Sequence, residues 1–99
     1  MKVIIQSVNF NMDKDLKLFI EDKLGVLEKY YDRIIGADVF LKVQQTSDKE
    51  NKNIEIRLKV PGDDLIVKKN SKTFEEGIKL SIDAFKRNLK KLKEKQRNH

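Results

Sequence analysis

The stretch that decides the fold is Thr73–His99, TFEEGIKLSIDAFKRNLKKLKEKQRNH. Apolar residues recur in it at alternating steps of three and four, the spacing of one face of an α-helix. Thr73 and Glu76 have the spacing of a capping box, in which the threonine hydroxyl accepts from the third backbone amide and the glutamate reaches back to the cap. The stretch therefore predicts one long helix with a narrow apolar seam, and the rest of the chain must supply a surface for it. The seam consists of Phe74, Ile78, Ile82, Phe85, Leu89 and Leu92.

The same stretch carries the net charge of the chain. From residue 84 to 99 there are seven lysines and arginines and one acidic residue, whereas the first 83 residues hold 15 cations and 15 anions. A helix dipole attracts cations only at its last turn, but this run spans about four turns. We interpret it as a surface for a polyanion, with nucleic acid as the leading partner and a solvated terminal helix as the alternative. The cations beside the seam are Lys72, Lys79, Lys86, Lys90, Lys93 and Arg97.

The first 72 residues supply four strands and one further helix. The period of the apolar residues is two in the strand segments and three to four in the helix, where Asp13 is the expected N-cap. Pro61-Gly62 predicts a tight turn between the last two strands, and residues 46–53 form a polar loop. The predicted strands are residues 2–8, 34–45, 54–60 and 65–69, and the first helix is residues 14–31 with the inner seam Leu16, Ile20, Leu24, Leu27 and Tyr31.

These elements predict an α/β (α+β) two-layer sandwich in the order βαβββα. The first helix is a crossover that makes the first strand parallel to a neighbour, and the other three strands form an antiparallel meander. Both helices have one narrow seam and the strands have one apolar face, so the helices are expected side by side on one face of a four-stranded sheet. We expect a single domain over residues 1–99.

The amino-acid composition gives little indication of a catalytic site. The chain has no cysteine and a single histidine, His99, so the usual nucleophile–base pairs and zinc ligand sets are missing. Asp63-Asp64 and Glu75-Glu76 have structural roles in a turn and a helical first turn. We expect a binding protein with no catalytic residues, no metal and no cofactor. The chain shows no signal peptide and no apolar run of about 20 residues, which predicts a cytoplasmic protein without a membrane partner.

Two aromatic residues, Tyr30 and Tyr31, lie next to basic Lys29 and Arg33. They are candidates for base stacking, but aromatic residues at the end of an amphipathic helix usually belong to the core. We expect Tyr31 to be buried and Tyr30 to be partly exposed.

One block of sequence resembles a known family. Leu27–Ile34, LEKYYDRI, followed by Val39–Val43, VFLKV, is similar to the K-L-E-K-Y-F-D-R-I and V-x-L-K-V segments of the ribosome hibernation promoting factor family, which includes ribosome-associated inhibitor A. The resemblance covers the whole chain and ends in a basic helix. The chain departs from the family pattern in one segment and at one residue. Residues 73–79, TFEEGIK, replace D-x-Y-A-A-I-D, and Gly25 replaces a better helix former.

The resemblance implies a fold similar to a double-stranded-RNA-binding domain and a function on the ribosome. Family members bind ribosomal RNA of the small subunit between head and body, where messenger and transfer RNAs would sit, and inhibit translation in stationary phase or stress. Long members carry an extra domain that pairs two ribosomes. This chain resembles the short form, expected to be monomeric away from the ribosome; whether it forms ribosome dimers with a second factor stays open.

The basic positions that match the family motifs are the candidate contacts to ribosomal RNA, and two further positions come from the cationic stripe alone. Such contacts to phosphates position a protein without reading sequence. The matching positions are Lys23, Lys29, Arg33, Arg87, Lys91, Lys93 and Lys95, with Lys42 as a weaker one, and the stripe adds Lys86 and Lys90.

Three other functions compete with this interpretation. The first is a general double-stranded-RNA-binding module that is not tied to the ribosome, although such domains usually have a lysine-rich start to the last helix and here the start is acidic. The second is a protein–protein module for an acidic partner. The third, a small-molecule enzyme, has the least support.

Overall fold

Strands and helices follow one another in the predicted order βαβββα. The computed structural model describes residues 1–97, with the side chains of residues 96 and 97 left aside. Expectations about His99 lie outside the described residues. The elements are β1 (Lys2–Val8), α1 (Lys14–Tyr30), β2 (Gly36–Val43), β3 (Lys52–Lys59), β4 (Leu65–Ser71) and α2 (Phe74–Arg97).

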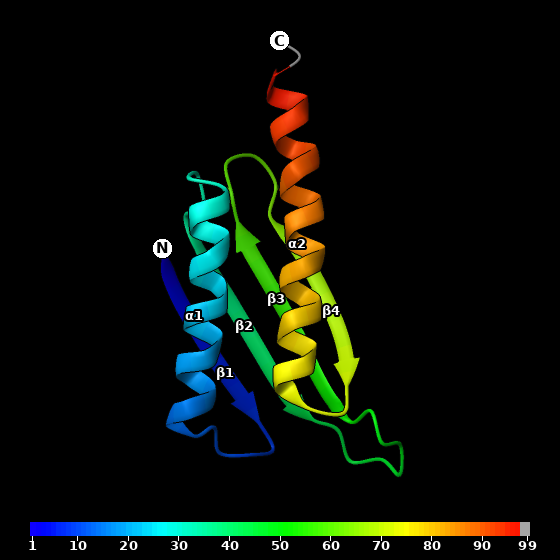
Figure 1. The fold of residues 1–99 in the computed structure, drawn as a ribbon. Helices are drawn as coiled ribbons and strands as arrows, with labels where there is room; N and C mark the ends of the chain where they lie inside the picture. Colours follow the sequence, from blue (N-terminus) through cyan, green and yellow to red (C-terminus); the bar gives the residue numbers. More distant parts are fainter. Residues whose placement is uncertain (98–99) are drawn as a thin grey trace.

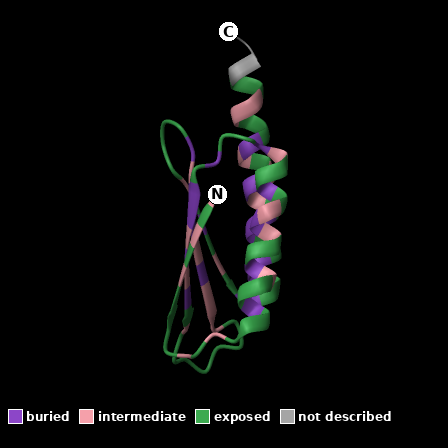
Figure 2. Cartoon of the chain, turned by 90° about the vertical axis from the view of Figure 1, so that its left-hand side faces the viewer, coloured by how far each residue is buried: buried purple, intermediate pink, exposed green. Residues whose placement is uncertain are grey.

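The four strands form one mixed sheet in the order β1-β2-β3-β4. β1 is parallel to β2, since α1 carries the chain back to the starting end of the sheet, and the remaining pairs are antiparallel (Figure 1). Both helices cover the same face of the sheet, and the other face is open (Figure 2). The predicted two-layer sandwich is confirmed.

The core lies where the two helical seams meet the apolar face of the sheet. Phe85 of α2 is fully buried, as are Ile20, Leu24 and Leu27 of α1. The predicted seams are therefore correct, and Leu92, near the end of α2, is half-buried and packs against the core. The sheet contributes Ala37, Val39, Leu41, Ile54, Ile56, Leu58 and Val67.

Local hydrogen bonds mark the predicted helix starts, and a positive φ marks the predicted turn. The Asp13 carboxylate accepts a hydrogen bond of 2.8 Å from the backbone N–H of Leu16, and the Thr73 hydroxyl accepts one of 3.1 Å from the N–H of Glu76. The reciprocal bond from the backbone of Thr73 to the Glu76 carboxylate stays a prediction. Gly62 has a φ of +96°, a conformation that favours glycine and explains the tight turn after Pro61.

Some element boundaries differ from the predictions. β3 begins at Lys52 rather than Ile54, because the backbone of Lys52 pairs with Val43 across the sheet. Backbone N–H and C=O groups form the hydrogen bonds between strands, whatever the side chain. Polar residues can therefore extend a strand without the alternation of apolar residues by which strands are predicted. α1 ends at Tyr30, because Tyr31 has extended backbone (φ −142°) while its N–H still donates to the carbonyl of Leu27.

One glycine allows α2 to approach the sheet closely. A Cβ on Gly77 would lie 2.1 Å from Cδ1 of Ile54 and 2.6 Å from Oγ of Ser71. The Ser71 hydroxyl donates a hydrogen bond of 2.6 Å to the carbonyl of Thr73, so the serine is held in place. A side chain larger than hydrogen at Gly77 would push the first turns of α2 away from β3.

Candidate nucleic-acid interface

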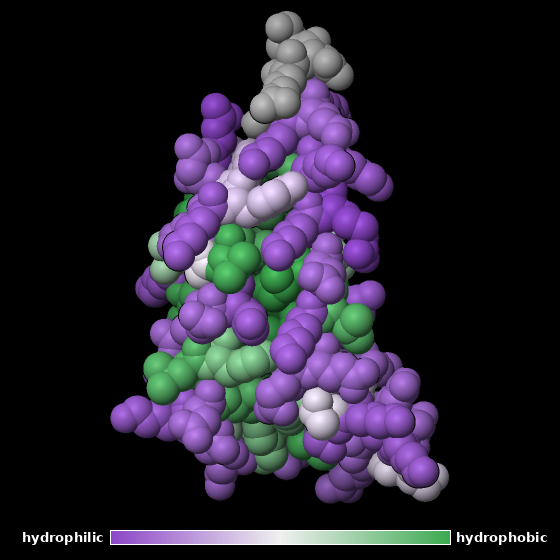
Figure 3. All heavy atoms as spheres, in the orientation of Figure 1, coloured by the Kyte–Doolittle hydropathy of each residue, from purple (hydrophilic) through white to green (hydrophobic). Residues whose placement is uncertain are grey.

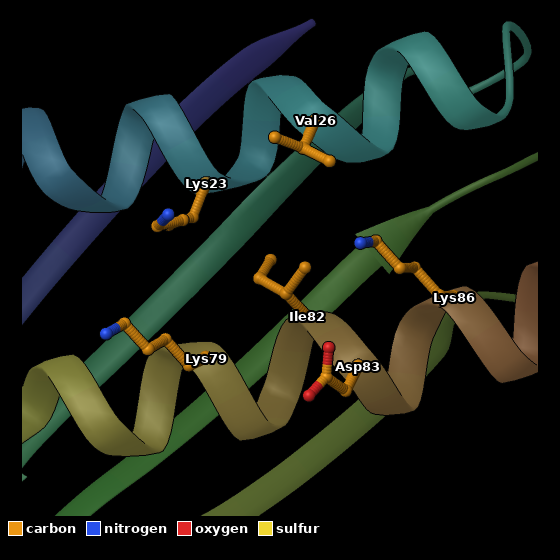
Figure 4. Close-up of a pocket in the computed structure, with 6 residues that line it drawn as sticks. All are labelled: Lys23, Val26, Lys79, Ile82, Asp83 and Lys86. Carbon is orange, nitrogen blue, oxygen red and sulfur yellow. The ribbon is translucent and has the colours of Figure 1, made fainter.

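A groove of about 240 Å³ separates the outer surfaces of α1 and α2 on the side away from the sheet. On each helix the spacing of most of its lining residues is three or four positions, which places them on one side of that helix. Figure 4 shows the side chains of both helices converging on it, with Val26 and Ile82 as apolar lining between three lysines and one carboxylate. The groove is lined by Lys23, Val26, Lys79, Ile82, Asp83 and Lys86.

The groove combines an apolar floor with a cationic rim. Figure 3 shows hydrophobic atoms between the two helices, bordered by hydrophilic side chains. The three lysine ammonium groups outnumber the single carboxylate of Asp83, so the groove has a positive potential. A phosphate chain with an apolar or sugar edge fits this arrangement of charges.

Cation–π contacts extend the row of cations toward the end of α1. The amine of Lys93 lies 4.2 Å from the centre of the Tyr30 ring, and the amine of Lys23 lies 5.5 Å from that of Phe19. Tyr31 is buried and Tyr30 is half-buried, as predicted. Because Lys93 covers one face of the Tyr30 ring, a base can stack on that face only if Lys93 leaves it.

The helical cations have no acidic partners among the side chains that the structure describes. Lys59 pairs with Asp38 at 3.3 Å and Lys68 with Glu55 at 3.5 Å, both on the sheet, and the amino terminus pairs with Glu28. No lysine or arginine of the described part of α1 or α2 forms an ion pair. Their charge is therefore available to an external anion.

The structure brings some of the predicted site residues together and separates others. Lys23 and Lys86 line the groove, and Lys90 and Lys93 lie on the same flank of α2 as Lys86. By the same periodicity, Arg87 lies on the outer side of α2, and Lys91 and Lys95 lie beyond it on the flank away from α1.

Three further predicted residues also lie away from the groove and are not on α2. Lys29 is exposed on α1, and Arg33 is exposed in the turn after it. Lys42 lies on the open face of the sheet, opposite the helices, because residues alternate between the two faces of β2 and Leu41 faces the core. It does not join the helical cations.

Lys79 lines the groove but was not among the predicted contacts. It belongs to the cationic stripe, seven residues before Lys86, so the same periodicity that selected Lys86 could have selected it. The groove itself could not be foreseen, since it depends on which flank of α2 faces α1.

Neither a metal cluster nor a membrane span is found in the described residues. They contain no group of three or more His, Cys, Asp or Glu side chains that could hold a metal ion. Within residues 1–97, neither helix has the length and apolar character needed to cross a bilayer.

Comparison with known proteins identifies relatives over the whole chain. The sequence model of the family described as "Sigma 54 modulation protein / S30EA ribosomal protein" matches residues 3–97. The ribosome hibernation promoting factor of Azotobacter vinelandii is 30% identical, over 97% of this chain and 86% of its own length. That of Pseudomonas putida is 28% identical, over 99% of this chain and 92% of its own length. This chain matches only 45% of the length of the ribosome hibernation promotion factor of Deinococcus radiodurans, at 29% identity.

Solved structures also share the fold of this chain. The N-terminal domain of Protein Y from Thermus thermophilus superposes with a TM-score of 0.78 at 20% identity, covering 93% of this chain and 99% of that one. A ribosomal subunit interface protein from Coxiella burnetii gives a TM-score of 0.82 at 18% identity, covering 94% and 98%.

Proposed function

Because this chain belongs to the sigma 54 modulation protein / S30EA ribosomal protein family, we propose that it is a ribosome hibernation factor that binds the ribosome and inhibits translation. Its binding surface is the outer face of the two helices, on both sides of the interhelical groove. The ligand is ribosomal RNA of the small subunit, in the channel that messenger and transfer RNAs use. The protein acts in the cytoplasm during stationary phase or stress, and is a monomer away from the ribosome.

The observation that carries the proposal is the row of cations without acidic partners along the groove. Folded RNA presents closely spaced phosphates, and each lysine that neutralises one releases counterions. Lys23, Lys79 and Lys86 surround the groove, so a phosphate chain running along it meets ammonium groups from both helices. Such contacts position a protein on RNA by shape and charge.

The remaining predicted cations extend this surface. Lys90 and Lys93 continue the row toward the carboxyl end of α2, while Arg87, Lys91 and Lys95 give that end a basic outer surface. In Figure 1, α2 projects past the end of α1 and of the sheet. A projecting basic helix can enter a narrow RNA-lined space that the body of the domain cannot. Lys29 and Arg33 supply the outer contacts of α1.

Co-sedimentation with separated ribosomal subunits over a salt series tests the proposal. We expect binding to the small subunit that weakens as salt rises, and inhibition of translation in a cell-free system at the same protein concentrations. No binding at low salt would refute the ribosome as the ligand. Equal affinity for free duplex RNA and for the small subunit would indicate a general double-stranded-RNA-binding module instead.

A further inference from the structure

The face of the sheet opposite the helices is uncovered and carries exposed apolar side chains. Ile4 on β1 is 43% exposed and Ile66 on β4 is 49% exposed. Phe40 is half-buried on β2, and it is not among the residues that pack against the core. Its partners across the sheet are Gln6 and Glu55, so its ring lies near the centre of this face.

Cations surround Phe40 at short range. Lys42 follows it by two residues on the same strand, about 7 Å away, and Arg57 is its diagonal neighbour on β3, about 7–8 Å away. The two carboxylates of this face are compensated, Glu55 by Lys68 at 3.5 Å and Asp38 by Lys59 at 3.3 Å. Lys42 and Arg57 form no ion pair among the described residues, so the surroundings of the ring carry a net positive charge.

We propose that this open sheet face is a second RNA-binding surface, which takes single-stranded RNA with one base stacked on Phe40 and the flanking phosphates on Lys42 and Arg57. The positive charge favours a polyanion, and an aromatic ring beside it favours one that presents a flat, unpaired base. Duplex RNA cannot offer such a face without opening. The proposal goes beyond the proposed function, because the helical surface takes the phosphates of folded RNA and needs no unpaired base.

The absence of tryptophan from the chain makes a direct test possible. In the Phe40→Trp variant all indole emission comes from the proposed stacking position. We expect oligouridylate of about ten nucleotides, within the site sizes of single-strand binders, to quench this emission. A blunt RNA duplex of the same length should leave the emission unchanged.

Leucine at residue 40 separates stacking from apolar contact. Phe40→Leu keeps an apolar side chain but removes the ring, so the affinity for labelled oligouridylate, measured by fluorescence anisotropy, should fall about 5- to 150-fold, the range that follows from the loss of one stacked base. Leu18→Ala is the matched control, because Leu18 is an exposed apolar residue on α1, far from this face. Circular dichroism should show unchanged folding for both variants.

Combining Phe40→Trp with alanine at Lys86, Arg87, Lys90 and Lys91 distinguishes the two surfaces. At saturating oligouridylate this variant should still show the quenching, while its binding to the small subunit is strongly weakened. Quenching that disappears with the helical cations would overturn the proposal, as would unchanged affinity of Phe40→Leu.

Other occupants of the face would also overturn the proposal. Emission that changes with protein concentration in the absence of RNA would identify a second copy of the chain. Emission that responds to polyglutamate and not to oligouridylate would identify an acidic protein. Failure of the small-subunit assay alone would refute the proposed function and leave the sheet surface intact.

Discussion

The two faces of the molecule carry cations in different electrostatic settings. On the sheet, two of the lysines pair with carboxylates of neighbouring strands, Lys59 with Asp38 and Lys68 with Glu55. On the helices, none of the described cations has an acidic partner within ion-pair distance. Similar residue types are therefore partly neutralised on one face and available on the other.

The difference follows from how each element arranges its neighbours. Strand register brings Lys68 directly opposite Glu55, so an opposite charge is supplied across the sheet. In α2 the neighbours of a cation are three or four residues away, and there they are often other cations: Lys86, Lys90 and Lys93 follow one another at these steps. Such like-charge pairs cost a few tenths of a kcal/mol each, and a polyanion would relieve that cost. Counting charges alone would not separate the two faces.

The largest expected effect is a loss of folding stability when a core residue of α2 is truncated. Phe85→Ala should lower the free energy of unfolding by about 3–5 kcal/mol, since Phe85 is fully buried between α2 and the sheet. Chemical denaturation measures it, with Leu18→Ala as the exposed control, for which a change within about 0.5 kcal/mol is expected. A Phe85→Ala variant as stable as the parent would contradict the packing of α2.

Removing helical cations should affect binding and not folding. Alanine at Lys86, Arg87, Lys90 and Lys91 should weaken small-subunit binding by several kcal/mol and reduce the slope of log affinity against log salt by about four, one for each phosphate that the variant no longer neutralises. Co-sedimentation over a salt series measures both quantities.

A control variant with the same reduction in charge tests whether the position of the helical cations matters. Alanine at four cations that the proposed function does not assign to RNA contacts should change the salt slope much less. Equal effects of the two variants would mean that only net charge matters. The control cations are Lys14, Lys17, Lys49 and Lys68.

Gly77→Ala tests how closely the helical layer approaches the sheet. We expect the free energy of unfolding to fall by about 1–2 kcal/mol, because overpacking against Ile54 and Ser71 costs ~1–3 kcal/mol and exceeds the gain in helix propensity. Thermal unfolding measures the change, and a rise in melting temperature would show that the contact relaxes freely.

The same substitution in the other helix should have the opposite sign. Gly25 lies in α1, and an added Cβ there meets no atom within 4 Å. Gly25→Ala should raise the free energy of unfolding by up to ~1 kcal/mol through helix propensity and the entropy of the unfolded chain. Loss of stability would indicate a contact that the added Cβ disturbs.

Much of the fold could be predicted because each element carries its own periodic signal. The seam of α2, the N-caps Asp13 and Thr73 and the turn at Gly62 are local features, and the structure contains all of them. The start of β3 at Lys52 was missed, because Lys52 and Asn53 join the sheet through their backbones and carry no hydrophobic signal. The candidate site was predicted as a list of cations without their spatial grouping.

The sequence by itself determined the βαβββα order, the two apolar seams and the concentration of charge in the last helix. Periodicity and composition are properties of short segments, so they need no knowledge of distant contacts. Only the tertiary structure decided that Lys79 and Lys86 face Lys23 across a groove, that Lys93 lies over Tyr30, and that Lys42 is on the opposite face. Those relations depend on how the helices are rotated and placed against the sheet, which is set by packing between residues far apart in the chain.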